Sequence, residues 1–269
     1  MLKTVPAPHI LTAFNTAAAS ENRIHDDATA QKFGFTGALV PGVEVYAYMC
    51  HMPVAAWGRA FLEHGALECR FSKPVYDGAR TTVSADAEGP ALRLQVKGDG
   101  EQRASGTSWP HHDEAEPNIA DYPIAMPPKI RPLAGFDTLL EGGALGIEPL
   151  LIDRALRDGY LVDVSENDDI YVRDNLVHPG QILRLCNAAL VQNVVLGPWI
   201  HVGSKVRHFA PAMVDDRLTL RSRILSNVET KGHAMVTIDA IAIANDATVV
   251  SRIEHVAIWR PRQVAQTAA

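Results

Sequence analysis

A short polar segment near the amino end carries the side chains best suited to acid–base chemistry. His25 lies in a polar turn that also holds Asn22, Asp26 and Asp27. A carboxylate on one ring nitrogen would fix the tautomer of this imidazole and raise its basicity, so His25 is a candidate general base. The same turn could instead carry a structural histidine that caps the short helix expected from Asp26, and both interpretations stay open.

A second feature follows at Gly42, which opens an apolar segment from Val43 to Trp57 with apolar residues at helical spacing. The first N–H groups of a helix have no partner within the helix. The main-chain N–H of Gly42 or Val43 would therefore donate to an oxygen that gains negative charge, whereas Pro41 has no N–H to offer. A base together with such donors suits a reaction that passes through an enolate.

Three further side chains are candidates for substrate binding. Glu44 stands in the first turn of the same helix, where it complements the helix dipole, but a carboxylate there could also activate water. His178 precedes Pro179 at the entry of a second apolar helix and would either face a groove or be structural. Arg207 could bind a phosphate group of a substrate or only an acidic neighbour.

Composition limits the partners that we expect. The 269 residues are 47% apolar and 21% charged, with a net charge of −6, as in folded globular proteins, and without a basic field that would bind nucleic acid. The three cysteines are widely spaced and odd in number, so we expect no disulfide framework. The adjacent His111 and His112 predict no metal site. Without a signal sequence or an apolar run of membrane-spanning length, we expect a cytoplasmic protein with no membrane partner.

The elements that must position these residues follow one plan written twice. Gly42 and Gly180 open the two apolar helices and are 138 positions apart, and the prolines of two strand-like segments, Pro74 and Pro211, are 137 apart. Alternating segments typical of antiparallel strands follow each proline. Six prolines between Trp109 and Pro132 mark a linker in which no regular element is expected. The chain therefore contains an internal repeat.

We expect a first repeat in residues 1–112, a linker in 113–134, a second repeat in 135–262 and a tail in 263–269. The tripeptide 20–22 returns as 165–167, but the interval from its asparagine to the helix glycine is seven residues shorter in the second half. A functional groove is therefore expected in the first repeat and a degenerate one in the second.

The segment Ser20-Glu21-Asn22-Arg23-Ile24-His25-Asp26-Asp27, followed by Gly34-Phe35 and Leu39-Val40-Pro41-Gly42, resembles the MaoC-like dehydratases and (R)-specific enoyl-CoA hydratases. Their signature reads Asp-x-Asn-Pro-x-His, an acidic residue two places later, Gly-Phe, and His-Gly at the start of a central helix. The positions that match are Asn22, His25, Asp27, Gly34, Phe35 and Gly42. Ser20 stands in place of the family's catalytic Asp, Pro41 in place of its second His, and Arg23 in place of its proline.

The resemblance implies an α+β tandem double hotdog, in which each repeat wraps an antiparallel sheet around a central helix. It also implies an acyl-thioester hydratase or dehydratase that acts on an acyl-CoA or acyl-carrier thioester, with no cofactor besides the CoA of the substrate. His25 would be the retained acid/base, Asn22 and Ser20 would position water, and Gly42 would stabilise the enolate. The family also forms homodimers, so a dimer of this chain is a further expectation.

Alternatives remain for residues and function alike. Asn22 could only close an Asx turn, and Ser20 could be an N-cap or turn residue. A hotdog thioesterase would use Glu44 to activate water. A non-catalytic acyl-CoA-binding protein would bind the same ligand without turnover.

Overall fold

The two apolar segments form the central helices α2 (Gly42–Trp57) and α6 (Pro179–Asn193) of a computed structural model that describes residues 4–262. Most side chains of α2 are buried on every side, as expected of a helix enclosed by a sheet. Helix α6 begins with proline at its first position, where the missing N–H costs nothing. The expected tail, 263–269, lies outside the described residues.

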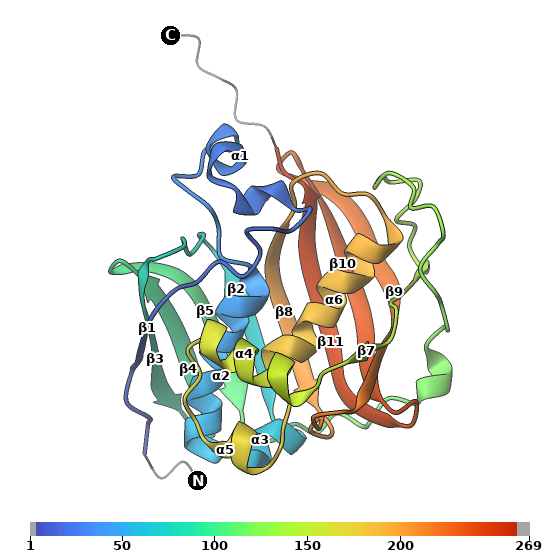
Figure 1. The fold of residues 1–269 in the computed structure, drawn as a ribbon. Coiled ribbons are helices and arrows are strands. Elements are labelled where there is room, and N and C mark those ends of the chain that lie inside the picture. Colours follow the sequence, from blue (N-terminus) through green and yellow to red (C-terminus); the bar gives the residue numbers. More distant parts are fainter. Residues whose placement is uncertain (1–3, 263–269) are drawn as a thin grey trace.

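One antiparallel sheet curves around both helices (Figure 1). The first half of the chain contributes β1 (His9–Thr12), β2 (Ala66–Phe71), β3 (Arg80–Glu88), β4 (Ala91–Gly98) and β5 (Glu101–Trp109). The second half contributes β6 (Ala144–Gly146), β7 (Leu150–Leu151), β8 (Ile200–His208), β9 (Arg217–Thr230), β10 (His233–Ala244) and β11 (Thr248–Arg260).

The strand order is β1-β3-β4-β5-β2-β8-β11-β10-β9-β6, with β7 also pairing with β9. The order in the second half is the reverse of that in the first, because β8, β11, β10, β9 and β6 are the counterparts of β2, β5, β4, β3 and β1. The halves meet where β2 pairs antiparallel with β8, from Ala66 opposite Arg207 to Arg70 opposite Gly203. This pseudo-twofold arrangement is the tandem double hotdog that the sequence predicts.

Short helices complete the fold. They are the 3-10 turn η1 (Arg23–His25), α1 (Asp27–Lys32), α3 (Arg59–His64), η2 (Ile119–Asp121), α4 (Arg154–Asp163) and α5 (Ile170–Arg173). The first two form a segment that overhangs one end of the sheet, above the start of α2 (Figure 1). No helix within residues 4–262 combines the length and apolar character needed to cross a membrane.

Two details differ from the sequence analysis. Strand β5 was not anticipated, because it is rich in small polar residues and only Ala104 and Ser108 are fully buried, which leaves little hydrophobic periodicity. The proline-rich linker holds one turn of 3-10 helix, η2, where no regular element was expected. The Tyr122 hydroxyl donates to Asp239 Oδ2 (3.0 Å) and Arg221 donates to the Ile119 carbonyl (3.1 Å), which fixes this turn against β9 and β10.

The second repeat buries several histidines inside the sheet layer. His208 lies 2.9 Å from Ser251 Oγ through Nδ1, and His255 lies 3.2 Å from Ser204 Oγ. Burial lowers the pKa of both His208 and His255 to about 3. These imidazoles are therefore neutral in the folded protein at neutral pH.

We predict that the protein loses stability in mild acid. An unfolded His has a pKa of about 6.5, so between about pH 6.5 and pH 3 the unfolded chain binds more protons and stability falls as the pH falls. His208→Asn keeps a polar atom at the Nδ1 position and cannot titrate. It should remove about 1.4 kcal/mol per pH unit from the slope of unfolding free energy against pH, measured by urea denaturation. Equal slopes in wild type and variant would contradict this.

Candidate active site

The segment that carries the predicted motif is fixed by one apolar anchor. Ile24 is buried with Ala30 and Leu39 in a small cluster beneath the overhanging segment. Asn22 caps η1, because its Oδ1 accepts a hydrogen bond from the Ile24 N–H (3.4 Å). His25 is the last residue of this turn and is half-buried, so its ring faces the interior rather than open solvent.

The hydrogen bonds of His25 determine which nitrogen carries the proton. Nδ1 lies 2.6 Å from the Leu39 carbonyl oxygen, which can only accept, so Nδ1 is the donor. Nε2 is then the unprotonated nitrogen, and it accepts from Asn22 Nδ2 at 3.2 Å. Burial lowers the pKa of His25, partly offset by the bond to Leu39. The side chain is therefore a neutral imidazole with a basic Nε2.

The partner of the ring differs from the carboxylate that the sequence suggested. Asp26 caps α1 by accepting from the Thr29 N–H (3.0 Å). Asp27 accepts from the Ala38 N–H (2.6 Å) and is exposed. Both acidic residues stabilise local turns, and the backbone carbonyl at Leu39 orients the imidazole. A carbonyl partner fixes the tautomer without adding a negative charge.

Asn22 connects the motif to the second repeat. Its Nδ2 donates to the Trp199 carbonyl (2.9 Å), and its Oδ1 accepts from the Trp199 N–H (3.1 Å). This pair of hydrogen bonds joins the first repeat to the residue just before β8 in the second repeat. Asn22 therefore closes the expected Asx-type turn and also positions the two halves of the site.

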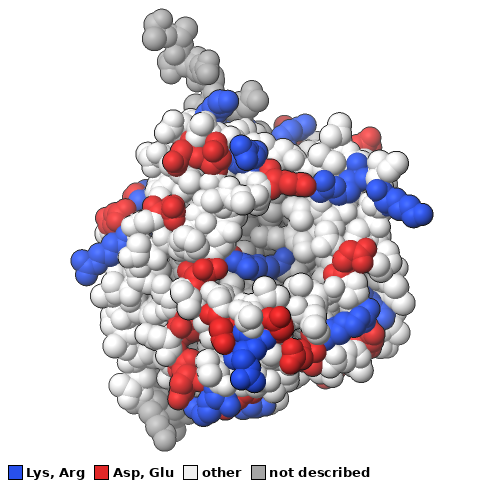
Figure 2. Space-filling model, in the orientation of Figure 1, with Lys and Arg blue, Asp and Glu red and all other residues white. Residues whose placement is uncertain are grey.

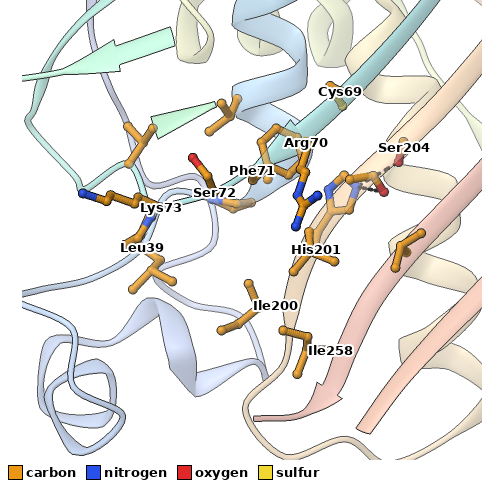
Figure 3. Close-up of a pocket in the computed structure, with 18 of the residues that line it drawn as sticks. Leu39, Cys69, Arg70, Phe71, Ser72, Lys73, Ile200, His201, Ser204 and Ile258 are labelled. Atoms are coloured by element: carbon orange, nitrogen blue, oxygen red, sulfur yellow. Dashed lines mark hydrogen bonds between the residues drawn. The ribbon is translucent and has the colours of Figure 1, made fainter. Parts of the chain in front are cut away.

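Gly42 begins α2 directly against the second repeat. The N-cap of helix α2 is Pro41, which makes no side-chain hydrogen bond, so no capping side chain occupies the first N–H groups of the helix. A Cβ on Gly42 would lie 2.8 Å from His201 Nδ1, so only glycine fits here. The His201 ring is held in turn by Ser204 Oγ, 2.8 Å from Nε2, and by the Gly203 carbonyl (Figure 3).

Two cavities meet beside His25. The larger one, of about 1030 Å³, lies where β2 and β8 separate, under the overhanging segment (Figure 3). The smaller one, of about 700 Å³, opens on the helical face, and Figure 2 shows a hollow there with charged residues around it. The residues that line both cavities are Asn22, His25, Pro41, Asn187 and Trp199.

The two cavities differ in their lining. Near His25 the larger cavity is apolar, with Ile24, Phe35, Val45, Phe71, Val75 and Ile200 in its wall. Basic side chains also line it: Arg70, Lys73, Arg93, Lys205 and Lys231. The smaller cavity has Lys129, Arg131 and Arg184 in its wall. Acidic residues accompany them, Glu68 and Glu254 in the larger cavity and Glu21, Glu44 and Glu148 in the smaller, so only the larger cavity has an excess of basic side chains.

The remaining predicted residues near the motif lie at the smaller cavity. Ser20 and Val43 line it, and Ser20 Oγ is 3.4 Å from the Asn22 carbonyl oxygen. Glu44 also borders it but is 1% exposed. Its carboxylate accepts hydrogen bonds from Thr16 Oγ1 (2.9 Å), from the Tyr160 hydroxyl (2.7 Å) and from Arg184 Nε (2.8 Å). Glu44 therefore joins the two central helices.

The other two predicted binding residues lie away from both cavities. His178 is buried at the N-cap of α6, where Nδ1 accepts from the Gly180 N–H (3.0 Å) and Nε2 is 3.7 Å from Glu166 Oε2. Arg207 forms ion pairs with Glu68 and with Glu114 (2.9 Å). His178 therefore has the structural role, and Arg207 the acidic neighbours, that the sequence left open as alternatives to ligand binding.

The amino end of α6 differs from that of α2. The space in front of Gly180 is occupied by the Tyr160 hydroxyl and by Ala47, whose Cβ is 2.7 Å from the place of an added Cβ. Tyr160 comes from α4, a helix that has no counterpart of equal length before α2. The first repeat thus has an open cavity at its helix terminus, whereas the second has a filled one.

Several residues of the site could not be found from the sequence. Trp199, His201 and Asn187 lie far from the motif and reach it only through the pairing of the two repeats. Asn187 alone left a local signal, as a polar residue within an apolar helical pattern. Within residues 4–262, no three His, Cys, Asp or Glu side chains are grouped in a way that could hold a metal ion.

Comparison with known proteins extends the result on the fold. No protein-family model and no curated protein matches the sequence. Among solved structures, a protein described as a MaoC domain dehydratase from Chloroflexus aurantiacus is 14% identical, with a TM-score of 0.63 over 97% of this chain and 94% of its own. Rv0216 from Mycobacterium tuberculosis, a double hotdog protein, is 15% identical, with a TM-score of 0.60 over 94% and 96%.

A third similar structure is the dehydratase domain of a mycocerosic acid synthase-like polyketide synthase. It is 18% identical, with a TM-score of 0.55, and the match covers 95% of this chain and 93% of that domain. At these identities the likeness establishes the fold. The chain therefore has the double hotdog fold of MaoC-like dehydratases along nearly its whole length.

We predict that Gly42→Ala is destabilising. The added methyl would lie 2.8 Å from His201 Nδ1 and 3.1 Å from its Cβ and Cγ, so α2 or His201 must move. Overpacking of this kind costs about 1–3 kcal/mol, measured by urea unfolding. The matched control is Gly159→Ala in α4, where the methyl meets no atom within 4 Å and should add up to about 1 kcal/mol of helix stability. A Gly42→Ala protein as stable as wild type would contradict the contact.

Proposed function

We propose that the protein is a hydro-lyase that adds water to, or removes it from, a 2-enoyl or 3-hydroxyacyl thioester. The observation that carries the proposal is the basic Nε2 of His25, which lies where two cavities meet, beside the amino end of α2. A base and main-chain donors at one place suit a reaction whose transition state transfers negative charge to a carbonyl oxygen.

In the forward direction a water molecule would attack the β-carbon of the enoyl thioester. One O–H bond breaks and its proton passes to His25 Nε2, while the new C–O bond forms and the electron pair of the double bond moves toward the carbonyl oxygen. The N–H groups of Gly42 and Val43 would stabilise this enolate. His25 then returns the proton to the α-carbon, so the imidazole is neutral again at the end.

The arrangement of the cavities suits a thioester in the middle of a long substrate. Its two arms can leave the reacting centre in different directions, one into each cavity. The excess of basic residues in the larger cavity supports a substrate with phosphates, such as CoA or a phosphopantetheine carrier. The acyl-thioester substrate is thus a proposal that rests on the site, in line with the dehydratases that share the fold.

We predict that purified wild-type protein hydrates short 2-enoyl-CoA substrates and that His25→Ala lowers kcat/KM by about 10²- to 10⁴-fold. Because burial lowers the pKa of His25, the rate should rise with pH to a plateau, with its midpoint below pH 6.5. The loss of absorbance of the enoyl thioester measures the rate. An identical acid limb in wild type and His25→Ala would show that another group is the base.

A separate prediction concerns Ser20, which stands in place of the family's aspartate. Ser20 lines the smaller cavity beside Asn22 and His25. A carboxylate there would be an additional acceptor for water, so Ser20→Asp should raise kcat with little change in KM. Steady-state kinetics would test this, with Ser20→Asn as the uncharged control. A slower Ser20→Asp enzyme would mean that water is held by other groups in this protein.

The same assays distinguish the other two functions. A thioesterase would release free CoA, which a thiol reagent detects, and Glu44→Gln would abolish that release. A binding protein would bind acyl-CoA and turn over none of it. Either result would replace the proposed hydro-lyase.

A further inference from the structure

Two residues at the junction of the cavities, Asn187 and Trp199, belong neither to the motif nor to the entry of α2. Asn187 lies on α6, the central helix of the second repeat, and lines both cavities together with His25 and Asn22. The residues of α6 that line the smaller cavity are Arg184, Asn187, Ala188, Val191 and Gln192. This spacing is one face of a helix, so Asn187 is directed at the reacting centre by the geometry of α6.

The carbonyl oxygen of the Asn187 carboxamide has no hydrogen-bond partner within residues 4–262, although it is shielded from solvent. Asn193, on the same helix, shows the usual arrangement, because its Nδ2 donates to the carbonyls of Gly146 and Ala189, each at 2.7 Å. A shielded carbonyl oxygen without a hydrogen bond weakens a fold, so the asparagine at 187 is not explained by stability.

The repeat provides a comparison inside the molecule. Gly42 and Gly180 are equivalent, so Asn187 corresponds to Met49 of α2. Met49 is fully buried in the core, as its apolar side chain favours. Asn187 thus lies at the open cavities, whereas the residue at the equivalent position of α2 is packed in the core.

We infer that Asn187 binds the oxygen that adds to the β-carbon, an inference that rests on the proposed function. A carboxamide donates through Nδ2 and accepts through Oδ1, which suits a hydroxyl group or a water molecule. One hydrogen of the water passes to His25. The other stays on the oxygen, which accepts a hydrogen bond from Asn187 Nδ2, so Asn187 neither gains nor loses a proton. Asn187 would hold the water in the part of the site where Ser20 has replaced a carboxylate.

The test compares two ligands that differ only in this hydroxyl, 3-hydroxybutyryl-CoA and butyryl-CoA, by calorimetry. Wild type should bind the hydroxylated ligand about three- to tenfold more tightly, as one net hydrogen bond implies. Asn187→Leu should bind both equally and melt at or above the wild-type temperature. Gln95→Leu on β4 is the matched control, because Gln95 is a half-buried carboxamide that lines neither cavity, and it should keep the wild-type preference.

Each outcome decides the inference. Loss of the preference in Asn187→Leu, with a lower kcat for hydration, supports it, and Asn187→Ser serves the same comparison if the leucine variant fails to fold. Equal affinity of wild type for the two ligands, or a preference that survives in Asn187→Leu, overturns it. A wild-type preference without any hydration would overturn the proposed function and leave the hydroxyl site standing. Binding of neither ligand would overturn both.

Discussion

The antiparallel pairing of β2 with β8 is the interaction on which the rest of the structure depends. It joins the two sheets, so that neither repeat leaves this strand edge open to another chain. The same pairing brings the start of β8 against the start of α2, where His201 packs on Gly42 and Trp199 holds Asn22 from both sides of its carboxamide. Residues of both strands line the larger cavity, so its shape depends on this junction.

The two repeats share a plan and differ in what fills the amino end of each helix. In the second repeat Tyr160 blocks Gly180 and donates to Glu44, which also binds Arg184 of α6. A buried carboxylate costs free energy unless it is paired and hydrogen-bonded, and here three donors satisfy it. Tyr160 thus fills the space at the amino end of α6 and also supports the contact between Glu44 of α2 and Arg184 of α6. This contact lies beside the smaller cavity.

The polar groups of the site are neutral, and hydrogen bonds fix the orientation of each side chain. A backbone carbonyl determines the tautomer of His25, and the Asn22 amide lies between His25 and Trp199. Because no carboxylate is bonded to the imidazole, burial keeps its pKa low and the ring neutral. Such a base is ready to accept a proton at neutral pH, and its environment requires no second charge for stability.

The sequence by itself determined the repeat, the two central helices and the motif around His25, because hydrophobic periodicity and residue spacing are local properties of the chain. It did not reveal β5, whose small polar residues carry little periodicity, and it assigned His25 a carboxylate partner where a carbonyl stands. Only the tertiary structure decided that Trp199, His201 and Asn187 share the site with Asn22 and Gly42. These contacts depend on strand pairing between segments more than 100 residues apart, and no local pattern encodes that register.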